Sequence, residues 1–104
     1  MIVTTGNEIT DRPIRQYLGI VRGIVVRAPT ISQGLVGGFK SILGGHIEEF
    51  SEVCERARLE AYERMVQHAQ DMGADAVIGM RYDATEFSQS VTEVLAYGTA
   101  VKLD

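Results

Sequence analysis

The chain has 104 residues, of which 45% are hydrophobic and 23% charged, with two prolines and a formal net charge of −4. This length supports one hydrophobic core, so we expect a single domain over residues 1–104, and the composition excludes a disordered chain. The acidic balance argues against a partner made of nucleic acid, because such a partner requires a clustered basic surface.

The two halves of the chain carry opposite charge. Residues 1–45 hold five basic and two acidic side chains, a net of +3, whereas residues 46–104 hold five basic and twelve acidic side chains, a net of −7. Electrostatic fields of opposite sign on the two halves of a small protein can steer head-to-tail contact between its copies. The alternative interpretation is an acidic helix beside a more neutral sheet.

Nothing in the sequence marks the protein for export or for a membrane. No charged segment followed by an apolar run opens the chain, and Cys54 is the only cysteine, which excludes an internal disulfide. The apolar stretches are interrupted well short of the roughly 20 residues that cross a bilayer. We therefore expect a cytoplasmic protein without a membrane partner.

The first half of the chain is predicted to begin with two strands. Residues 1–5 form a short one, and residues 14–27, rich in β-branched side chains, form a longer one. Gly19 and Gly23 lie in the longer strand, where we expect a bulge or a close backbone approach.

A glycine-rich segment follows the second predicted strand. The apolar spacing over residues 32–45 predicts a short helix that its glycines loosen. The run at residues 34–45 lacks the GxxxxGK[ST] pattern of a phosphate-binding loop. We interpret its glycines as close-packing or hinge positions.

The strongest predicted element is a helix over residues 47–72. Its apolar stripe recurs every three or four residues: Phe50, Val53, Cys54, Ala57, Ala61, Met65, Ala69 and Met72. Glu48 and Glu49 in the first turn favour the positive end of the helix dipole, and Gly73 is placed to cap the other end. We expect the stripe, including the Cys54 thiol, to be buried against a sheet.

Two strands over residues 76–86 and 92–103 are predicted to form an antiparallel hairpin in which Glu86 lies opposite Thr92. In this register, large residues face small ones, a surface that a helix can approach closely. We assign that face to the core under the long helix: Ile78 with Ala100, Met80 with Gly98, Tyr82 with Ala96, and Ala84 with Val94.

The other face of the predicted hairpin is half apolar. It pairs Val77 with Val101, Gly79 with Thr99, Arg81 with Tyr97, Asp83 with Leu95, and Thr85 with Glu93. One long helix covers one face of a sheet, so we expect a second subunit to cover this one. The alternative is that scattered apolar residues on a wet face need no cover.

Three features of the sequence occur together: Gly44-Gly45 before the helix, the segment GADAVIG at residues 73–79, and EVLAYGTAV at residues 93–101. They carry a resemblance to the YbjQ-like family of bacterial and archaeal proteins, which is also called the putative heavy-metal-binding domain. It implies an α+β subunit of β-α-β-β type, in which one helix packs on a small twisted sheet as in dodecin subunits. It also implies a homopentameric ring. The chain departs from many relatives at residues 21–31, and the family supplies no catalytic residues to carry over.

The metal-binding name of the family is weakly supported by ligand types in this chain. Cys54 and His68 are fourteen residues apart on one helix, roughly 21 Å along its axis, and cannot share an ion within a subunit. His46 with Glu48 or Glu49 is the only local cluster of hard and borderline ligands, and symmetry could gather several copies of it around a divalent metal ion. The alternative is that these residues form an ordinary solvent-exposed first turn of the helix and bind no metal.

Polar residues on the second sheet face supply the remaining candidates. Arg81 beside Tyr97 could form a cation–π pair at a subunit contact or around a small anionic ligand. Asp83 and Glu93 are the nearby acids. Three hypotheses follow. The protein is a homo-oligomeric binding module for a metal ion or small ligand, an enzyme whose site is shared between subunits and includes Arg81, Glu93, Tyr97 and His46, or a purely structural assembly.

Overall fold

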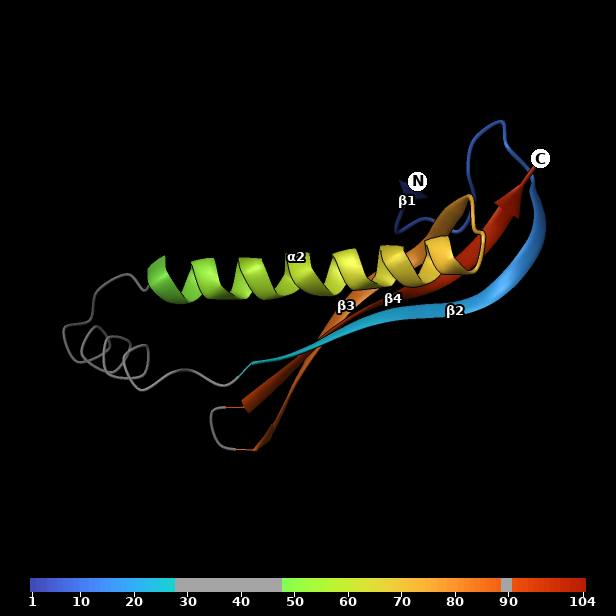
Figure 1. Ribbon diagram of the computed structural model, residues 1–104. Helices are drawn as coiled ribbons and strands as arrows, with labels where there is room; N and C mark the ends of the chain where they lie inside the picture. The colour runs from blue at the N-terminus through green and yellow to red at the C-terminus, as the bar shows by residue number, and fades with distance from the viewer. Residues whose placement is uncertain (28–47, 89–90) are drawn as a thin grey trace.

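The computed structural model describes residues 1–27, 48–88 and 91–104. One helix packs on a four-stranded mixed sheet in two layers, as Figure 1 shows, which confirms the predicted α+β class. The predicted helix over residues 32–45 lies outside the described residues. The elements in chain order are β1 (Ile2–Val3), β2 (Ile14–Arg27), α2 (Glu48–Asp71), β3 (Ala76–Ser88) and β4 (Val91–Leu103).

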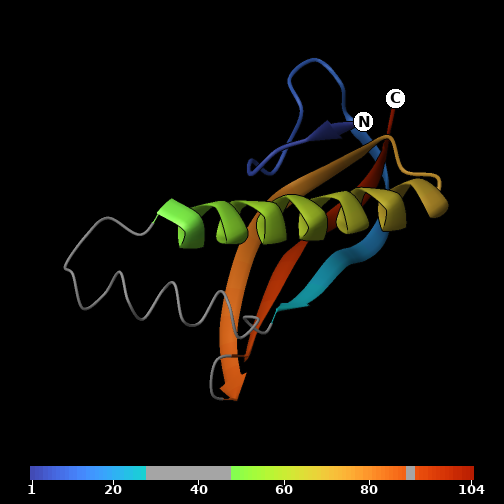
Figure 2. The same cartoon turned by 60° about the vertical axis from the view of Figure 1, so that its left-hand side comes forward.

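The sheet has the order β1-β3-β4-β2. The short β1 runs parallel to β3, whereas β4 is antiparallel to both of its neighbours. The helix α2 crosses one face of this sheet and packs mainly on β2 and β4, as Figures 1 and 2 show from two sides. The described residues contain no helix long and apolar enough to span a bilayer.

The strand β2 alternates between its two faces. Val21, Gly23 and Val25 are buried under α2, whereas the residues between them are exposed. A Cβ atom at Gly23 would lie 2.0 Å from the Ala61 carbonyl oxygen, so the backbones of helix and strand meet there. Gly19 has a φ of 124° at a shift in the β2–β4 register. Both predictions for these glycines are confirmed.

The helix buries a narrow line of side chains at four-residue intervals: Ala57, Ala61, Met65 and Ala69. Toward the start of the helix, this line continues to Val53, which is half-buried. Cys54 lies beside the line and not on it. The Cys54 thiol is exposed, so the prediction that it is buried was wrong. The apolar stripe read from the sequence was wider than the surface that the sheet covers.

The helix ends at Asp71, and Gly73 caps it as predicted, with a φ of 79°. Its N–H donates to the Gln70 carbonyl at 2.9 Å, and the next N–H, of Ala74, donates to the Ala69 carbonyl at 3.0 Å. These bonds satisfy carbonyl groups that the last turn of a helix leaves without a partner.

The β3–β4 hairpin has the predicted register from Arg81 to Glu86, where Glu86 lies opposite Thr92. A bulge between Ile78 and Arg81 then shifts the pairing by one residue, and Gly79 within it has a φ of 61°. Because a shift of one residue exchanges the two faces of a strand, the assignment before the bulge was wrong. The core under α2 receives Val77 instead of Ile78.

The helix also leaves the far half of β3 uncovered. We expected Tyr82 and Ala84 beneath α2, but Tyr82 is 44% exposed and Ala84 is exposed as well. The reason is the lateral position of α2, which packs little on β3. Of these predicted core pairs, the helix therefore covers only the β4 members, Ala96 and Val94, which are buried.

The second face of the sheet has its own cover at one end. Ala76, Ile78, Val101 and Leu103 form a buried cluster there, against which Ile9 and Ile14 pack. The segment between β1 and β2 thus covers Val101, for which we had expected a second subunit. That expectation was wrong for this end of the face, which lies near the two chain termini in Figure 1.

Candidate functional site

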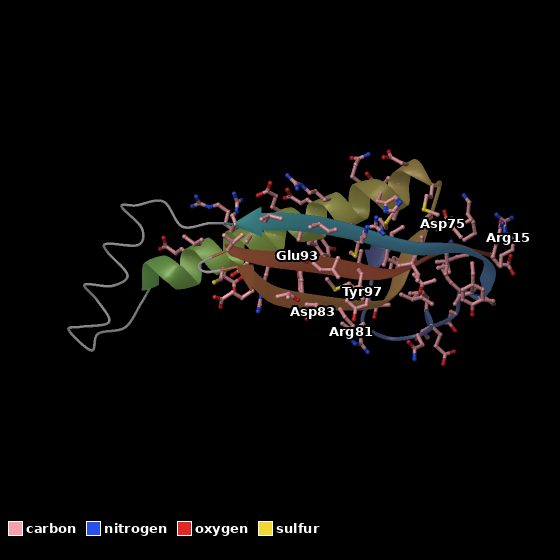
Figure 3. The ribbon with its side chains drawn as sticks, turned by 90° about the horizontal axis from the view of Figure 1, so that it is seen from below. Arg15, Asp75, Arg81, Asp83, Glu93 and Tyr97 are labelled. Atoms are coloured by element: carbon pink, nitrogen blue, oxygen red, sulfur yellow. The ribbon has the colours of Figure 1, made fainter. Side chains whose placement is uncertain are left out.

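The rest of the second face is open and carries large apolar side chains. Five of them, Ile20, Ile24 and Val26 of β2 with Leu95 and Tyr97 of β4, define what we call the open face. Ile20 is 75% exposed, Val26 55% and Tyr97 36%, although each lies within a regular strand. Figure 3 shows this face with Tyr97 and Glu93 along β4.

A shallow hollow of about 250 Å³ lies on the open face. Its lining comes from three adjacent strands: Ile20, Arg22, Asp83, Leu95 and Tyr97. The lining thus combines three residues that have polar groups, Arg22, Asp83 and Tyr97, with the aliphatic Ile20 and Leu95. Pockets for small molecules typically combine a few polar groups with an apolar surface in this way.

The predicted candidates Arg81, Glu93 and Tyr97 have different surroundings in the structure. Tyr97 lines the hollow, and Glu93 is half-buried on the same strand, opposite Thr85. Arg81 lies opposite Tyr97 in the register, but its guanidinium turns to the edge of the sheet (Figure 3). The Arg81 Nη1 atom donates to the backbone carbonyls of Thr5 at 2.9 Å and Met80 at 2.8 Å.

Within the described residues, the cation–π contact is made by Arg58 of α2, which lies 5.8 Å from the centre of the Tyr82 ring. Desolvation by burial and the nearby Tyr62 raise the pKa of Tyr82. Arg58 opposes this shift because a cation favours the phenolate. The pair joins the helix to the otherwise uncovered half of β3.

Two residues that line the hollow, Ile20 and Arg22, were missed because the pairing of β2 with β4 was not predicted. The pairing places Ile20 opposite Thr99 and Arg22 opposite Tyr97. The signal was present in the sequence, since Ile20, Arg22, Ile24 and Val26 alternate with the buried positions of the strand.

The side chains of the three predicted metal candidates lie outside the part of the chain that the structure describes. His46 lies outside the described residues, and Glu48 and Glu49 form the first turn of α2, where their side chains are likewise outside the description. No group of three or more His, Cys, Asp or Glu side chains comes together among the described residues. The His68 Nδ1 atom accepts the N–H of Arg22 at 3.2 Å, which satisfies one ring nitrogen.

Asp75 holds the end of the chain onto the sheet. Its Oδ2 atom accepts the N–H of Leu103 at 2.9 Å, and its Oδ1 atom lies 3.9 Å from the Lys102 Nζ atom. The hydrogen bond from Leu103 holds the pKa of this carboxyl below its ordinary value of 3.8, against an opposing effect of desolvation, and the charges of Lys102, Arg12 and Arg15 add to the lowering.

Comparison with known proteins supports the fold and identifies relatives. The model of the family described as "Putative heavy-metal-binding" matches residues 1–104. A UPF0145 protein of Legionella pneumophila, lpg0197, is 61% identical over 97% of this chain and 96% of its own length. A UPF0145 protein of Chromobacterium violaceum is 53% identical over 99% of this chain and 88% of its own length.

A solved structure shares the architecture at low identity. It is a protein of unknown function of the DUF74 family from Pediococcus pentosaceus, with a TM-score of 0.65 and 17% identity over 100% of this chain and 98% of that one. At this level of identity the similarity concerns the fold alone.

Proposed function

This chain belongs to the YbjQ-like family described as "Putative heavy-metal-binding", and from that premise we propose that it is the subunit of a cytoplasmic homo-oligomer that binds a small ligand between neighbouring copies. The pentamer implied by the family resemblance is the assembly we propose. A free and exposed Cys54 is compatible with a reducing compartment.

The observation that carries the proposal is the open face. Isolated exposed apolar residues are normal, but here they are contiguous over two adjacent strands and include Ile20 at 75% and Val26 at 55% exposure. A second copy that covers this face would remove the apolar surface from water, at about 25 cal/mol per Å². It would also close the hollow around Tyr97.

The ligand is proposed from the chemistry of the hollow. Arg22 offers a planar donor for an anionic group, and Asp83 accepts hydrogen bonds from a donor. Ile20 and Leu95 supply apolar contact between these polar groups. A small amphipathic molecule with an anionic group fits this set.

The description of the family favours a metal ion as the second candidate ligand. The described residues of one chain do not provide a ligand cluster for such an ion. We propose His46, Glu48 and Glu49, gathered from several copies around a symmetry axis, as the ligands of such an ion. Elemental analysis of the purified protein tests this candidate, and a stoichiometric metal that is lost in His46→Ala would establish it.

Tyr97→Asp tests the contact on the open face. If a neighbour covers Tyr97, the new carboxylate is desolvated at a cost of several kcal/mol, and the assembly dissociates or the subunit fails to fold. Leu59→Asp is the matched control, because Leu59 is an apolar residue that is 55% exposed on α2, away from the open face. Light scattering and thermal melting measure both variants. A Tyr97→Asp variant that assembles and melts like the parent contradicts the proposal.

The ligand is tested by native mass spectrometry of the assembly as purified. We expect added mass that corresponds to a bound small molecule, and we expect Arg22→Gln to lose it while the mass of the protein assembly is unchanged. Glu63→Gln on the exposed side of α2 should retain the molecule. A parent assembly whose mass equals that of its polypeptides alone, after gentle purification, argues for the purely structural alternative.

A further inference from the structure

Two residues of opposite charge line the hollow from different strands. Arg22 belongs to β2 and Asp83 to β3, and both are exposed. The register places Arg22 opposite Tyr97 of β4 and Asp83 opposite the residue two positions before it on the same strand. Figure 3 shows Asp83 and Tyr97 on neighbouring strands of this face. A cation and an anion therefore lie on either side of β4, with their strands about 10 Å apart across the sheet.

Neither of these charges is neutralised within the part of the chain that the structure describes. The ion pairs found there involve neither Arg22 nor Asp83. Arg81 lies two residues before Asp83 on β3, but its Nη1 atom donates to the Thr5 carbonyl at 2.9 Å. The Asp83 Oδ1 atom accepts the N–H of Ala84 at 2.9 Å, and none of the described residues donates to its Oδ2 atom. The two charges are left for a ligand.

The helix α2 fixes the backbone that carries Arg22. The His68 Nδ1 atom accepts the N–H of Arg22 at 3.2 Å. One turn earlier on the helix, the Arg64 Nη1 atom donates to the Ile24 carbonyl at 2.6 Å. On its other side, β2 pairs with β4. A cation on a backbone that is held from both sides loses less conformational freedom when a ligand binds, which favours affinity.

The rest of the lining is apolar, and the hollow is small. Leu95 and Tyr97 belong to the strand between the two charges, and Ile20, which is 75% exposed, adjoins them on β2. Sites for drug-sized molecules usually enclose about 300–1,000 Å³, whereas this hollow has about 250 Å³. A ligand that fits it has a short apolar body.

We propose that the hollow binds a small zwitterion with an apolar body, of the class of the free apolar amino acids. The carboxylate of the ligand pairs with the Arg22 guanidinium, and its ammonium group pairs with the Asp83 carboxylate. Its side chain contacts Ile20, Leu95 and Tyr97. This inference rests on the proposed ligand site and names the class of molecule that the site takes.

The two charges also determine what the hollow rejects. A ligand with a carboxylate and no ammonium group leaves Asp83 without a partner and brings two negative charges into one hollow. An amine without a carboxylate does the same to Arg22 with positive charge. A site that is built to pair both groups discriminates against an analogue that lacks either one.

Calorimetric titration of the dialysed assembly tests the class of ligand. The probes are L-leucine, 4-methylpentanoate, which lacks only the ammonium group, and 3-methylbutylamine, which lacks only the carboxylate. We expect L-leucine to bind at least about tenfold more tightly than either analogue, because each lost pair is a hydrogen bond between charged groups. L-Phenylalanine extends the test to an aromatic body. Native mass spectrometry verifies that dialysis has emptied the site.

Two substitutions assign the two charges. With Asp83→Asn we expect L-leucine and 4-methylpentanoate to bind within about twofold of each other, while the amide oxygen still accepts the N–H of Ala84. With Arg22→Gln we expect the same equality between L-leucine and 3-methylbutylamine. Glu86→Gln removes an acid of β3 that does not line the hollow, and it should keep the order of affinities of the parent. Circular dichroism verifies the fold of each variant.

The outcomes separate this inference from the proposed function. A parent that binds 4-methylpentanoate as tightly as L-leucine overturns the zwitterion and leaves an anion site standing. A parent that binds neither L-leucine nor L-phenylalanine overturns the amino-acid class, whereas a molecule retained by the assembly as purified still supports the proposed ligand site. A monomeric parent overturns the proposed assembly alone, because all the lining residues belong to one chain.

Discussion

At the scale of the residue, Asp75 shows how a single side chain fixes the end of the chain. Its carboxylate accepts the N–H of Leu103, and this bond is the main reason why its pKa is lowered. A carboxyl group whose pKa is lower in the folded state stabilises the fold above its unfolded pKa. That contribution is lost as the pH falls from about 3.8 through the folded value.

The corresponding prediction is that Asp75→Asn is less stable than the parent at pH 7 and that the difference shrinks below pH 4. The amide cannot carry the charge that Lys102 and the Leu103 N–H favour. Urea unfolding of both proteins at pH 7 and at pH 3 measures the two differences. A difference of equal size at the two pH values would show that the charge of Asp75 has no part in its effect.

Gly23 is a second residue whose role follows from geometry. The Cβ atom of an alanine at this position would lie 2.0 Å from the Ala61 carbonyl oxygen and 2.5 Å from the Met65 nitrogen, both of them backbone atoms that cannot rotate away. We expect Gly23→Ala to destabilise the fold by upwards of about 2 kcal/mol, because α2 must shift from the sheet. Chemical denaturation measures it. Gly6→Ala is the control, since its Cβ would lie 3.5 Å from its nearest neighbour, the Thr4 Oγ1 atom.

At the scale of the element, most of the secondary structure could be predicted from periodicity and turn residues. The bounds of β2 and the start and end of α2 follow from the alternation, the apolar stripe and Gly73. The bulge after Ile78 could not be predicted, because it depends on how Gly79 approaches the Gly6 carbonyl from a distant segment. Because of the extra residue in this bulge, the residues of β3 before it lie on the sheet face opposite to the one that we predicted for them.

The burial of α2 leads to a prediction about its core side. Met65 is fully buried between the helix and the sheet, whereas Leu59 on the same helix is 55% exposed. We expect Met65→Ala to cost about 2–5 kcal/mol in the free energy of unfolding, from lost burial and the cavity that remains. Leu59→Ala should cost less than about 0.5 kcal/mol. Equal effects of the two substitutions in urea titrations would show that α2 faces the sheet with a different side.

At the scale of the whole molecule, the sequence predicted that the single helix leaves one apolar face of the sheet uncovered. The exposed Ile20 and Tyr97 on that face agree with this prediction. The composition of the hollow was only partly foreseen. Tyr97 was a candidate, whereas Arg22 came from a strand whose partner was unknown. Arg81 showed why side-chain direction resists prediction, since its partner is the Thr5 carbonyl of a segment 76 residues away.

The central claim is that this chain functions as an assembly of identical copies, and its most direct test is the mass of the purified protein in solution. Native mass spectrometry and light scattering at micromolar concentration should give five times the 11.4 kDa of one subunit. This result would agree with a contact between copies that covers the open face. A mass of 11.4 kDa would contradict the account, because the apolar open face would then be exposed to water in the functional protein.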